Sequence, residues 1–178
     1  MQLPASGEGA LARINLIYVG PLDAQHHVSA LADAFLTAHD HDPRLHLLVV
    51  GEGGECDCLQ AQLGHTATFL GTLPQAQLDE LVARADLLVC PTTSADTAPT
   101  IIEAQKSGLP VLAVEGGDAA ALIENGRSGF LVPDDRAAFA GAIRWLSRRA
   151  TLRERLATGG LLAAGARHTS GQGRIMSV

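Results

Sequence analysis

The stretch LLVCPTTSADTAPTIIEAQKSGLPVLAV, residues 87–114, decides the fold. Two short apolar runs at its ends flank a polar loop and a segment with a helical pattern, residues 100–106. Gly108 and Pro110 follow that segment, and this pair of residues commonly terminates a helix. A strand, a helix and a second strand in this order predict a βαβ unit with parallel strands.

The same alternation continues in both directions from this stretch. Continuous apolar runs such as Leu47-Leu48-Val49-Val50 are typical of strands that are covered on both faces. The predicted strands cover 14–20, 45–51, 67–71, 87–91, 110–114 and 129–132, and the predicted helices 27–38, 78–82, 100–106, 119–124, 137–148 and 152–166. We therefore expect an α/β, three-layer Rossmann-like domain with a parallel sheet of about six strands in the order 3-2-1-4-5-6.

The length of 178 residues suits one domain rather than two. We expect a flexible leader at 1–12, the Rossmann-like domain at 13–168, and a disordered tail at 169–178, where no partner pattern is visible. The helix predicted at 152–166 is interrupted in its pattern by Gly159 and Gly160.

The composition excludes several classes of protein. The chain is 47% hydrophobic and 18% charged, which is typical of a globular domain. Its net charge is -6 and no basic stripe is present, so nucleic acid and anionic membranes are poor partners. The three cysteines form no disulfide framework, no signal peptide is visible, and no apolar stretch approaches the ~20 residues of a transmembrane segment. We expect a cytoplasmic protein.

The site of a ligand follows from the predicted topology. In open α/β sheets, ligands bind beyond the carboxyl ends of the strands, where the strand order reverses. The loops 20–27 and 92–100 follow the first and fourth strands, so they flank that crevice, and the loop 51–55 closes one side.

Two other patterns are weaker. A G-x-G-x-x-G dinucleotide fingerprint that begins at Gly51 would need a glycine at Cys56, and these glycines follow the second strand rather than the first. The segment 39–42, His-Asp-His-Asp, has residue types that bind metals, but it precedes Pro43 at a helix end, where solvated turns collect polar residues. We expect no metal and no cofactor, and no set of residues suggests a catalytic nucleophile or base.

The polar loop and helix start at 91–103 are suited to bind a nucleotide. Unpaired amides at a helix start bind anions such as a diphosphate. A carboxylate one turn further, that of Glu103, offers acceptors for both hydroxyls of a ribose. In the alternative interpretation, Thr100 and Glu103 form a capping box, and the carboxylate serves only its own helix.

Six short sequence segments, in the same order along the chain, resemble the C-terminal domain of the group 1 (family 4) glycosyltransferases of the GT-B fold. The resemblance covers about 14–167, and the block 103–113 is its most specific part. These segments are YVGPLD (18–23), LVVGEG (48–53), FLG (69–71), ADLLVCP (85–91), EAQKSGLPVLA (103–113) and IENGRSGFLV (123–132).

This resemblance implies a retaining transferase that takes a sugar from a nucleotide-diphosphate sugar without a metal. It also implies the binding residues. Glu103 would contact the donor ribose, and the backbone near Gly51, Gly53 and Gly71 would line the base. The first loop, with Gly20 and His26, and the amides of Thr97, Ala98, Thr100 and Ile101 would face the diphosphate and the sugar.

The sequence departs from the family pattern at the expected diphosphate site. Where the family has an arginine and a lysine in the first loop, this chain has Pro21 and His26. The first acid of the family's E-x7-E pair falls on Ala95, with Asp96 one residue away. Charge-assisted contacts to phosphate contribute about 1.5–3 kcal/mol each, so two losses weaken donor binding by roughly two to four decades. We expect weak, pH-sensitive donor binding, or its loss.

Three functions stay open from the sequence. The first is the donor-binding half of a cytoplasmic glycosyltransferase, whose N-terminal GT-B domain, absent from these residues, would meet the acceptor; we expect this chain alone to be inactive. The second is a degenerate, non-catalytic module for interaction or scaffolding. A third, more distant one is an epimerase or another GT-B-like enzyme.

Overall fold

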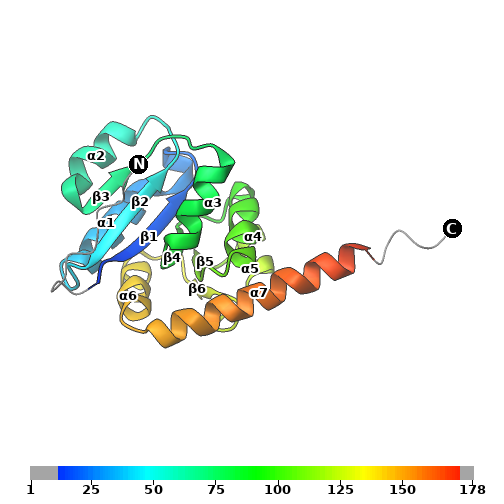
Figure 1. Cartoon of the computed structure of the whole chain (residues 1–178). Helices are drawn as coiled ribbons and strands as arrows, with labels where there is room; N and C mark the ends of the chain where they lie inside the picture. Colours follow the sequence, from blue (N-terminus) through cyan, green and yellow to red (C-terminus); the bar gives the residue numbers. More distant parts are fainter. Residues whose placement is uncertain (1–11, 173–178) are drawn as a thin grey trace.

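A parallel sheet of six strands in the order β3-β2-β1-β4-β5-β6 forms the centre of the molecule, as predicted (Figure 1). The computed structural model describes residues 12–172. All six residues of β2 are buried, which explains why all of them except His46 are apolar. The strands are β1 (Ile14–Val19), β2 (Leu45–Val50), β3 (Ala67–Phe69), β4 (Leu87–Cys90), β5 (Val111–Val114) and β6 (Phe130–Val132).

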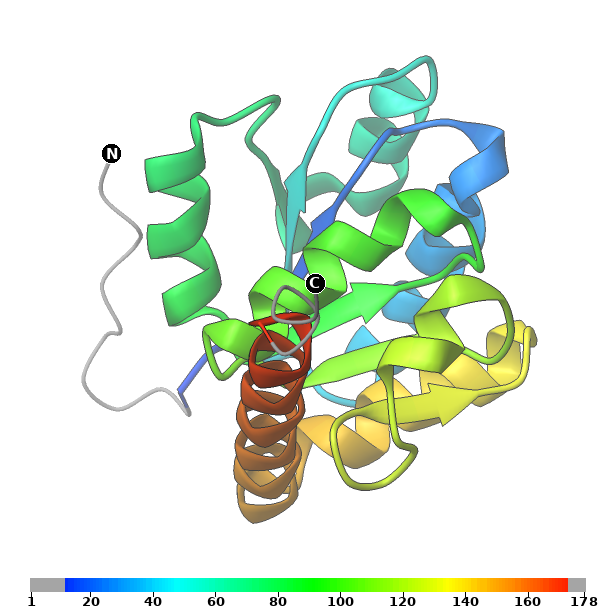
Figure 2. The same cartoon turned by 90° about the vertical axis from the view of Figure 1, so that its right-hand side faces the viewer.

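Helices cover both faces of this sheet, which confirms the three-layer prediction (Figures 1 and 2). On one face, Phe35 and Ile143 belong to the larger hydrophobic core; on the other, Leu81 and Ile101 belong to the smaller one. The first layer contains α1 (Val28–His39), α2 (Cys56–Leu63) and α6 (Arg136–Ser147), and the second contains α3 (Gln75–Arg84), α4 (Ala98–Lys106) and α5 (Gly117–Leu122).

Helix α2 was not predicted from the sequence. Only Leu59 and Leu63 are buried along its eight residues, so the segment lacks the apolar stripe by which an amphipathic helix is recognised. The cysteines at its start are unpaired: Cys56 is partly buried and Cys58 is exposed.

The last helix, α7 (Ala150–Gln172), is longer than predicted and continues through Gly159 and Gly160. Gly159 packs against the backbone of the loop before β6: a Cβ at this position would lie 1.9 Å from the carbonyl oxygen of Arg127. The glycine pair therefore allows close packing rather than ending the helix. The tail expected from residue 169 is thus wrong for 169–172, which are helical; the rest of the tail and residues 1–11 of the leader lie outside the described residues.

Helix α7 is fixed to the domain through α4. Gln105 of α4 is fully buried, and its side-chain amide donates to the carbonyl oxygens of Leu122 and Ser128 at 3.1 and 3.3 Å. Its Oε1 accepts a hydrogen bond from the guanidinium of Arg167. Within the described residues, no helix has both the length and the apolar character that crossing a membrane requires.

Candidate functional site

The loop after β1 turns back into the protein and buries His26. Asp23 caps the short 3-10 helix η1 (Ala24–His26): its Oδ1 accepts hydrogen bonds from the His26 amide at 3.1 Å and from the imidazole Nδ1 at 2.7 Å. The hydroxyl of Tyr18 donates to the carbonyl oxygen of Pro21 at 2.8 Å, which fixes the other side of the loop. The side chain of His26 is therefore held in one position and is only 7% exposed.

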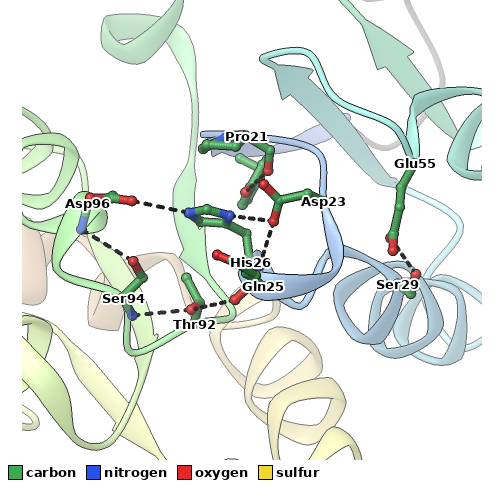
Figure 3. Close-up of polar contacts among 10 residues, drawn as sticks. Pro21, Asp23, Gln25, His26, Ser29, Glu55, Thr92, Ser94 and Asp96 are labelled. Carbon is green, nitrogen blue, oxygen red and sulfur yellow. Dashed lines mark hydrogen bonds and ion pairs between the residues drawn. The ribbon is translucent and has the colours of Figure 1, made fainter.

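The loop after β4 lies against this first loop (Figure 3). The Thr92 hydroxyl donates to the carbonyl oxygen of Gln25 at 3.5 Å and accepts from the Ser94 amide at 3.2 Å. Ser94 then caps the 3-10 helix η3 (Ala95–Thr97), because its hydroxyl accepts from the Asp96 amide at 3.4 Å. Strands β1 and β4 are neighbours where the strand order reverses, so both loops lie at the carboxyl edge of the sheet where the topology predicts a ligand.

His26 lies between two carboxylates (Figure 3). Its Nε2 is 3.5 Å from Oδ2 of Asp96, which is an ion-pair distance, but this buried nitrogen makes no hydrogen bond. The hydrogen bond from the imidazole lowers the pKa of Asp23, so this carboxylate is ionised at neutral pH and acts only as an acceptor. Burial raises the pKa of the nearby Tyr18, so its hydroxyl stays protonated.

The predicted glycines lie together, and their backbone groups bond to one another. The Gly20 amide donates to the carbonyl oxygen of Val50 at 3.0 Å, and the Gly51 amide donates to that of Gly71 at 2.9 Å. Gly53 packs so closely that a Cβ there would lie 2.2 Å from the carbonyl oxygen of Leu22. These glycines join the loops after β1, β2 and β3 into one edge; their role in lining a base stays a prediction.

Helix α4 begins at this edge, but two of its predicted donor groups are already bonded. The Thr97 amide donates to Ser94 at 3.2 Å and the Ala98 amide to Ala95, both within the η3 turn. A diphosphate would have to compete with that turn for these amides. Thr100 is partly buried, while the side chain of Ile101 is fully buried in the core, so Ile101 can meet a ligand only through its backbone.

Glu103 lies one turn further along α4 and is exposed to solvent. Its carboxylate accepts a hydrogen bond from Lys106 at 2.9 Å. The capping-box alternative is wrong, because α4 begins at Ala98, two residues before Thr100, with Pro99 in its first turn and no side-chain cap at the N-cap residue Thr97. The carboxylate is thus not used by its own helix start, and its side chain is 54% exposed.

Sequence reasoning missed three residues that shape the site: Asp23, Thr92 and Ser94. Asp23 precedes His26 by three residues, and this spacing is typical of a side chain that caps a short turn. The pattern could therefore have indicated the Asp23–His26 pair. The contact of Thr92 with Gln25 joins residues 67 positions apart, and no local pattern indicates it.

The other polar segments form structural contacts. Asp42 accepts two hydrogen bonds from the Arg44 side chain, at 2.8 and 2.7 Å, and the His41 ring bonds to the carbonyl oxygen of Thr37 at 2.9 Å. Residues 12–172 contain no group of three or more histidine, cysteine, aspartate or glutamate side chains arranged to hold a metal ion.

The family model described as "Glycosyl transferases group 1" matches residues 13–149, which include every residue of the candidate site. The chain belongs to the group 1 glycosyltransferases. Its fold also matches the C-terminal domain of the group 1 glycosyltransferase LpcC from Francisella tularensis, with a TM-score of 0.78, 18% identity, and coverage of 88% of this chain and 87% of that domain. The chain therefore has the fold of a C-terminal GT-B domain.

Two further relatives are known with a nucleotide or a nucleotide sugar. A GDP-mannose-dependent alpha-mannosyltransferase of Mycolicibacterium smegmatis is 36% identical over 118 residues, which are 66% of this chain and 30% of that enzyme. The structure of HepE from Anabaena in complex with UDP and glucose has a TM-score of 0.78 and 25% identity, and the match covers 90% of this chain and 47% of HepE. This group 1 chain thus spans less than half the length of these two relatives.

Proposed function

We propose that this domain binds a nucleoside-diphosphate sugar at the carboxyl edge of β1 and β4, as the donor half of a retaining glycosyltransferase. The observation that carries the proposal is the meeting of the first loop with the loop that leads into α4, which places His26 beside the η3 turn. The exposed carboxylate of Glu103 lies one helical turn beyond. In this arrangement a diphosphate lies between the loops, beside His26 and the start of α4, and the carboxylate of Glu103 accepts from the ribose hydroxyls.

The relatives support a nucleotide donor but leave the base open. HepE is solved with UDP, whereas the mycobacterial relative is named for GDP-mannose. The reaction itself needs an acceptor, and we propose that acceptor contacts come from the part of a GT-B enzyme that this domain does not contain. Transfer would then require both halves, while nucleotide binding would require only this one.

Calorimetric titration of the chain with UDP and with GDP tests this proposal. We expect binding of one of them in the high-micromolar to millimolar range, because both permanent cations of the family's first loop are absent. Glu103→Gln should weaken binding roughly tenfold, because it replaces a charge-assisted hydrogen bond to the ribose, about 1.5–3 kcal/mol, with a neutral one of about 0.5–1.5 kcal/mol.

Glu124→Gln is the matched control. Like Glu103, Glu124 is an exposed glutamate paired with a cation three residues later, in this case Arg127 at 3.2 Å. It lies in the loop before β6, so it is at the amino end of this strand and not at the carboxyl ends where the candidate site lies. If neither nucleotide binds at millimolar concentration, or if both substitutions weaken binding equally, the proposed donor site is wrong.

One observation favours a second candidate, a non-catalytic interaction module. The Asp23 and Asp96 carboxylates surround His26 at the place where a diphosphate would need positive charge. An absence of nucleotide binding in the titration above, with the chain folded by circular dichroism, would favour this module over the donor-binding domain.

A further inference from the structure

An arginine cluster lies where α6 ends and α7 begins. The segment 144–155 has five arginines and one acidic residue, whereas the rest of the chain has eight lysines and arginines and eighteen acidic residues. The arginines of the cluster are Arg144, Arg148, Arg149, Arg153 and Arg155. Among the described residues, none of them forms an ion pair with a carboxylate. The net charge of -6 therefore conceals a local cationic surface, and the expectation that anionic membranes are poor partners does not account for it.

The arginines of this cluster are held by carbonyl oxygens, which leave their charge in place. Arg148 donates to the carbonyl oxygen of His41 at 3.0 Å, and Arg149 donates to that of Trp145 at 3.2 Å. Arg153 donates to two carbonyl oxygens at the end of α6, at 2.8 and 2.6 Å. Each of these contacts uses one nitrogen of a guanidinium that has five N–H donors. The remaining donors are available for an anion, and phosphate is the one that a guanidinium binds best.

Trp145 lies among these arginines and is 39% exposed. The guanidinium of Arg149 lies over its ring, 4.8 Å from the centroid, and the ring of Phe130 packs against it with 5.2 Å between centroids. The indole N–H has no acceptor among the described residues. Because these neighbours occupy the ring, it is a poor stacking platform for a base or a sugar. An exposed indole edge with a free N–H suits the headgroup region of a bilayer, where tryptophans concentrate.

The cluster lies at the amino edge of the sheet, away from the candidate donor site. Helix α6 begins after the carboxyl end of β6, and its last turn is followed by Arg148, which contacts His41 in the turn before β2. Figure 1 shows the corner between α6 and α7 at a border of the molecule. Asp42, in the same turn as His41, is buried and bonded to Arg44 at 2.7 Å, so its carboxylate is already committed to another arginine.

We propose that segment 144–155 is a docking surface for a bilayer of anionic phospholipids. The arginines bind the lipid phosphates and carboxylates, and Trp145 enters the headgroup region. An acidic protein could match the charges, but the exposed tryptophan beside them favours lipid. Since the cluster lies at the amino edge, the carboxyl edge faces water when the domain is bound, and a soluble nucleotide can reach it.

Sedimentation of the full chain with vesicles tests this docking. We expect the chain to pellet with vesicles of about one third phosphatidylserine in phosphatidylcholine, and to stay in the supernatant with phosphatidylcholine alone. Binding should fall several-fold when the salt concentration rises from about 50 mM to about 300 mM, since salt screens surface charges. Equal binding to both kinds of vesicle, or to neither, would overturn the proposal.

A pair of double variants locates the surface. Arg148→Gln with Arg149→Gln should weaken vesicle binding roughly tenfold to thirtyfold, because each arginine near an anionic surface contributes about a fivefold factor. Arg84→Gln with Arg136→Gln is the control: it removes the same charge at two exposed positions outside the cluster, at the end of α3 and the start of α6. Circular dichroism checks that both variants are folded, and equal losses in the two would rule out this cluster as the docking surface.

Trp145 provides a measurement that needs no substitution, because it is the single tryptophan of the chain. Anionic vesicles should shift its emission to shorter wavelength, and lipids with brominated acyl chains should quench it. Pelleting without any change in emission would mean that another surface binds, which contradicts the proposal. Binding to soluble polyglutamate without binding to vesicles would also contradict it and would favour an acidic protein partner. None of these measurements includes a nucleotide, so their failure leaves the proposed donor site standing.

Discussion

Gly53 shows at the residue scale how closely the loops at the carboxyl edge approach one another. An alanine Cβ at this position would lie 2.2 Å from the carbonyl oxygen of Leu22 and 2.8 Å from its amide nitrogen, both backbone atoms that cannot rotate away. Gly53→Ala should therefore lower the free energy of unfolding by roughly 2–4 kcal/mol, measured by urea denaturation.

Gly54 is the control for this prediction, because it is the next residue and a Cβ there would meet no heavy atom within 4 Å. Gly54→Ala should change stability by less than about 0.5 kcal/mol. Equal effects of the two substitutions would show that the contact between the first and second loops does not hold in solution.

The sequence could indicate these glycines but not their physical role. The resemblance of segment 48–53 to the family implied that Gly51 and Gly53 line a base. The structure shows that Gly53 is also required by the backbone of Leu22, a residue of another loop. Such a requirement depends on how two loops pack, and a single sequence carries no record of that distance.

His46 makes a separate prediction for stability against pH. It is buried on β2, its Nε2 lies 2.8 Å from the Thr68 hydroxyl, and burial lowers its pKa to about 4. The unfolded chain has the ordinary histidine pKa near ~6.5, so it binds more protons than the folded chain between about pH 6.5 and pH 4. The contribution of His46 is complete above that window and is lost as the pH falls through it.

Urea denaturation at pH 7 and pH 4.5 should measure this loss as roughly 1–2 kcal/mol. His46→Gln should remove that part of the pH dependence, although it lowers stability at every pH. His168→Gln, at an exposed position on α7, should leave the wild-type pH dependence in place. A His46→Gln variant with the full wild-type slope would contradict the pKa of this buried ring.

Helix α7 carries the prediction at the element scale. Gly159 meets the Arg127 backbone, so a Cβ there would lie 1.9 Å from its carbonyl oxygen, whereas a Cβ at Gly165 would meet no heavy atom within 4 Å. Alanine favours a helix over glycine by about 1 kcal/mol. Gly165→Ala should therefore raise the melting temperature by up to ~4 °C, and Gly159→Ala should lower it.

Differential scanning calorimetry distinguishes these outcomes by their opposite signs. The two substitutions are chemically identical and lie in one helix, so propensity alone predicts that both stabilise. Stabilisation by Gly159→Ala would show that α7 does not pack against the loop before β6.

The elements differ in how far the sequence predicts them. Strands such as β2 were predicted well, because the buried residues 47–50 form a continuous apolar run. Helix α2 was missed because it buries only two leucines. In α7 the glycine pair interrupted the helical pattern of the sequence, because the reason for Gly159 is its contact with the backbone of Arg127, which lies in another segment of the chain. Apolar patterns in the sequence indicate which side chains are buried. They do not identify a helix that is mostly exposed, such as α2, or a helix that packs through its backbone, such as α7 at Gly159.

At the scale of the whole molecule, the alternation of strands and helices predicted the order of the sheet. Handedness and short connections leave few ways to arrange such a chain, so the topology, and with it the edge of the site, followed from the sequence. The Asp96–His26 contact joins two loops through side-chain positions at 3.5 Å. It could not be predicted, because such a distance depends on the complete packing of both loops.

The position of β1 and β4 at the centre of the sheet predicts how the molecule opens. Leu16 and Ile17 of β1 and Leu88 of β4 have no exposed surface, whereas Phe130 and Leu131 of the edge strand β6 are partly exposed. Amides of β1 and β4 should exchange with solvent only through global unfolding, and those of β6 faster.

Because the two central strands carry the loops 20–27 and 91–97, UDP at pH 6 should slow exchange in these loops and leave α2 and α6 unchanged, measured by hydrogen exchange and mass spectrometry. Equal slowing in every element would mean that the ligand stabilises the whole fold without contacting that edge, and slowing confined to α6 would place the ligand elsewhere on the domain.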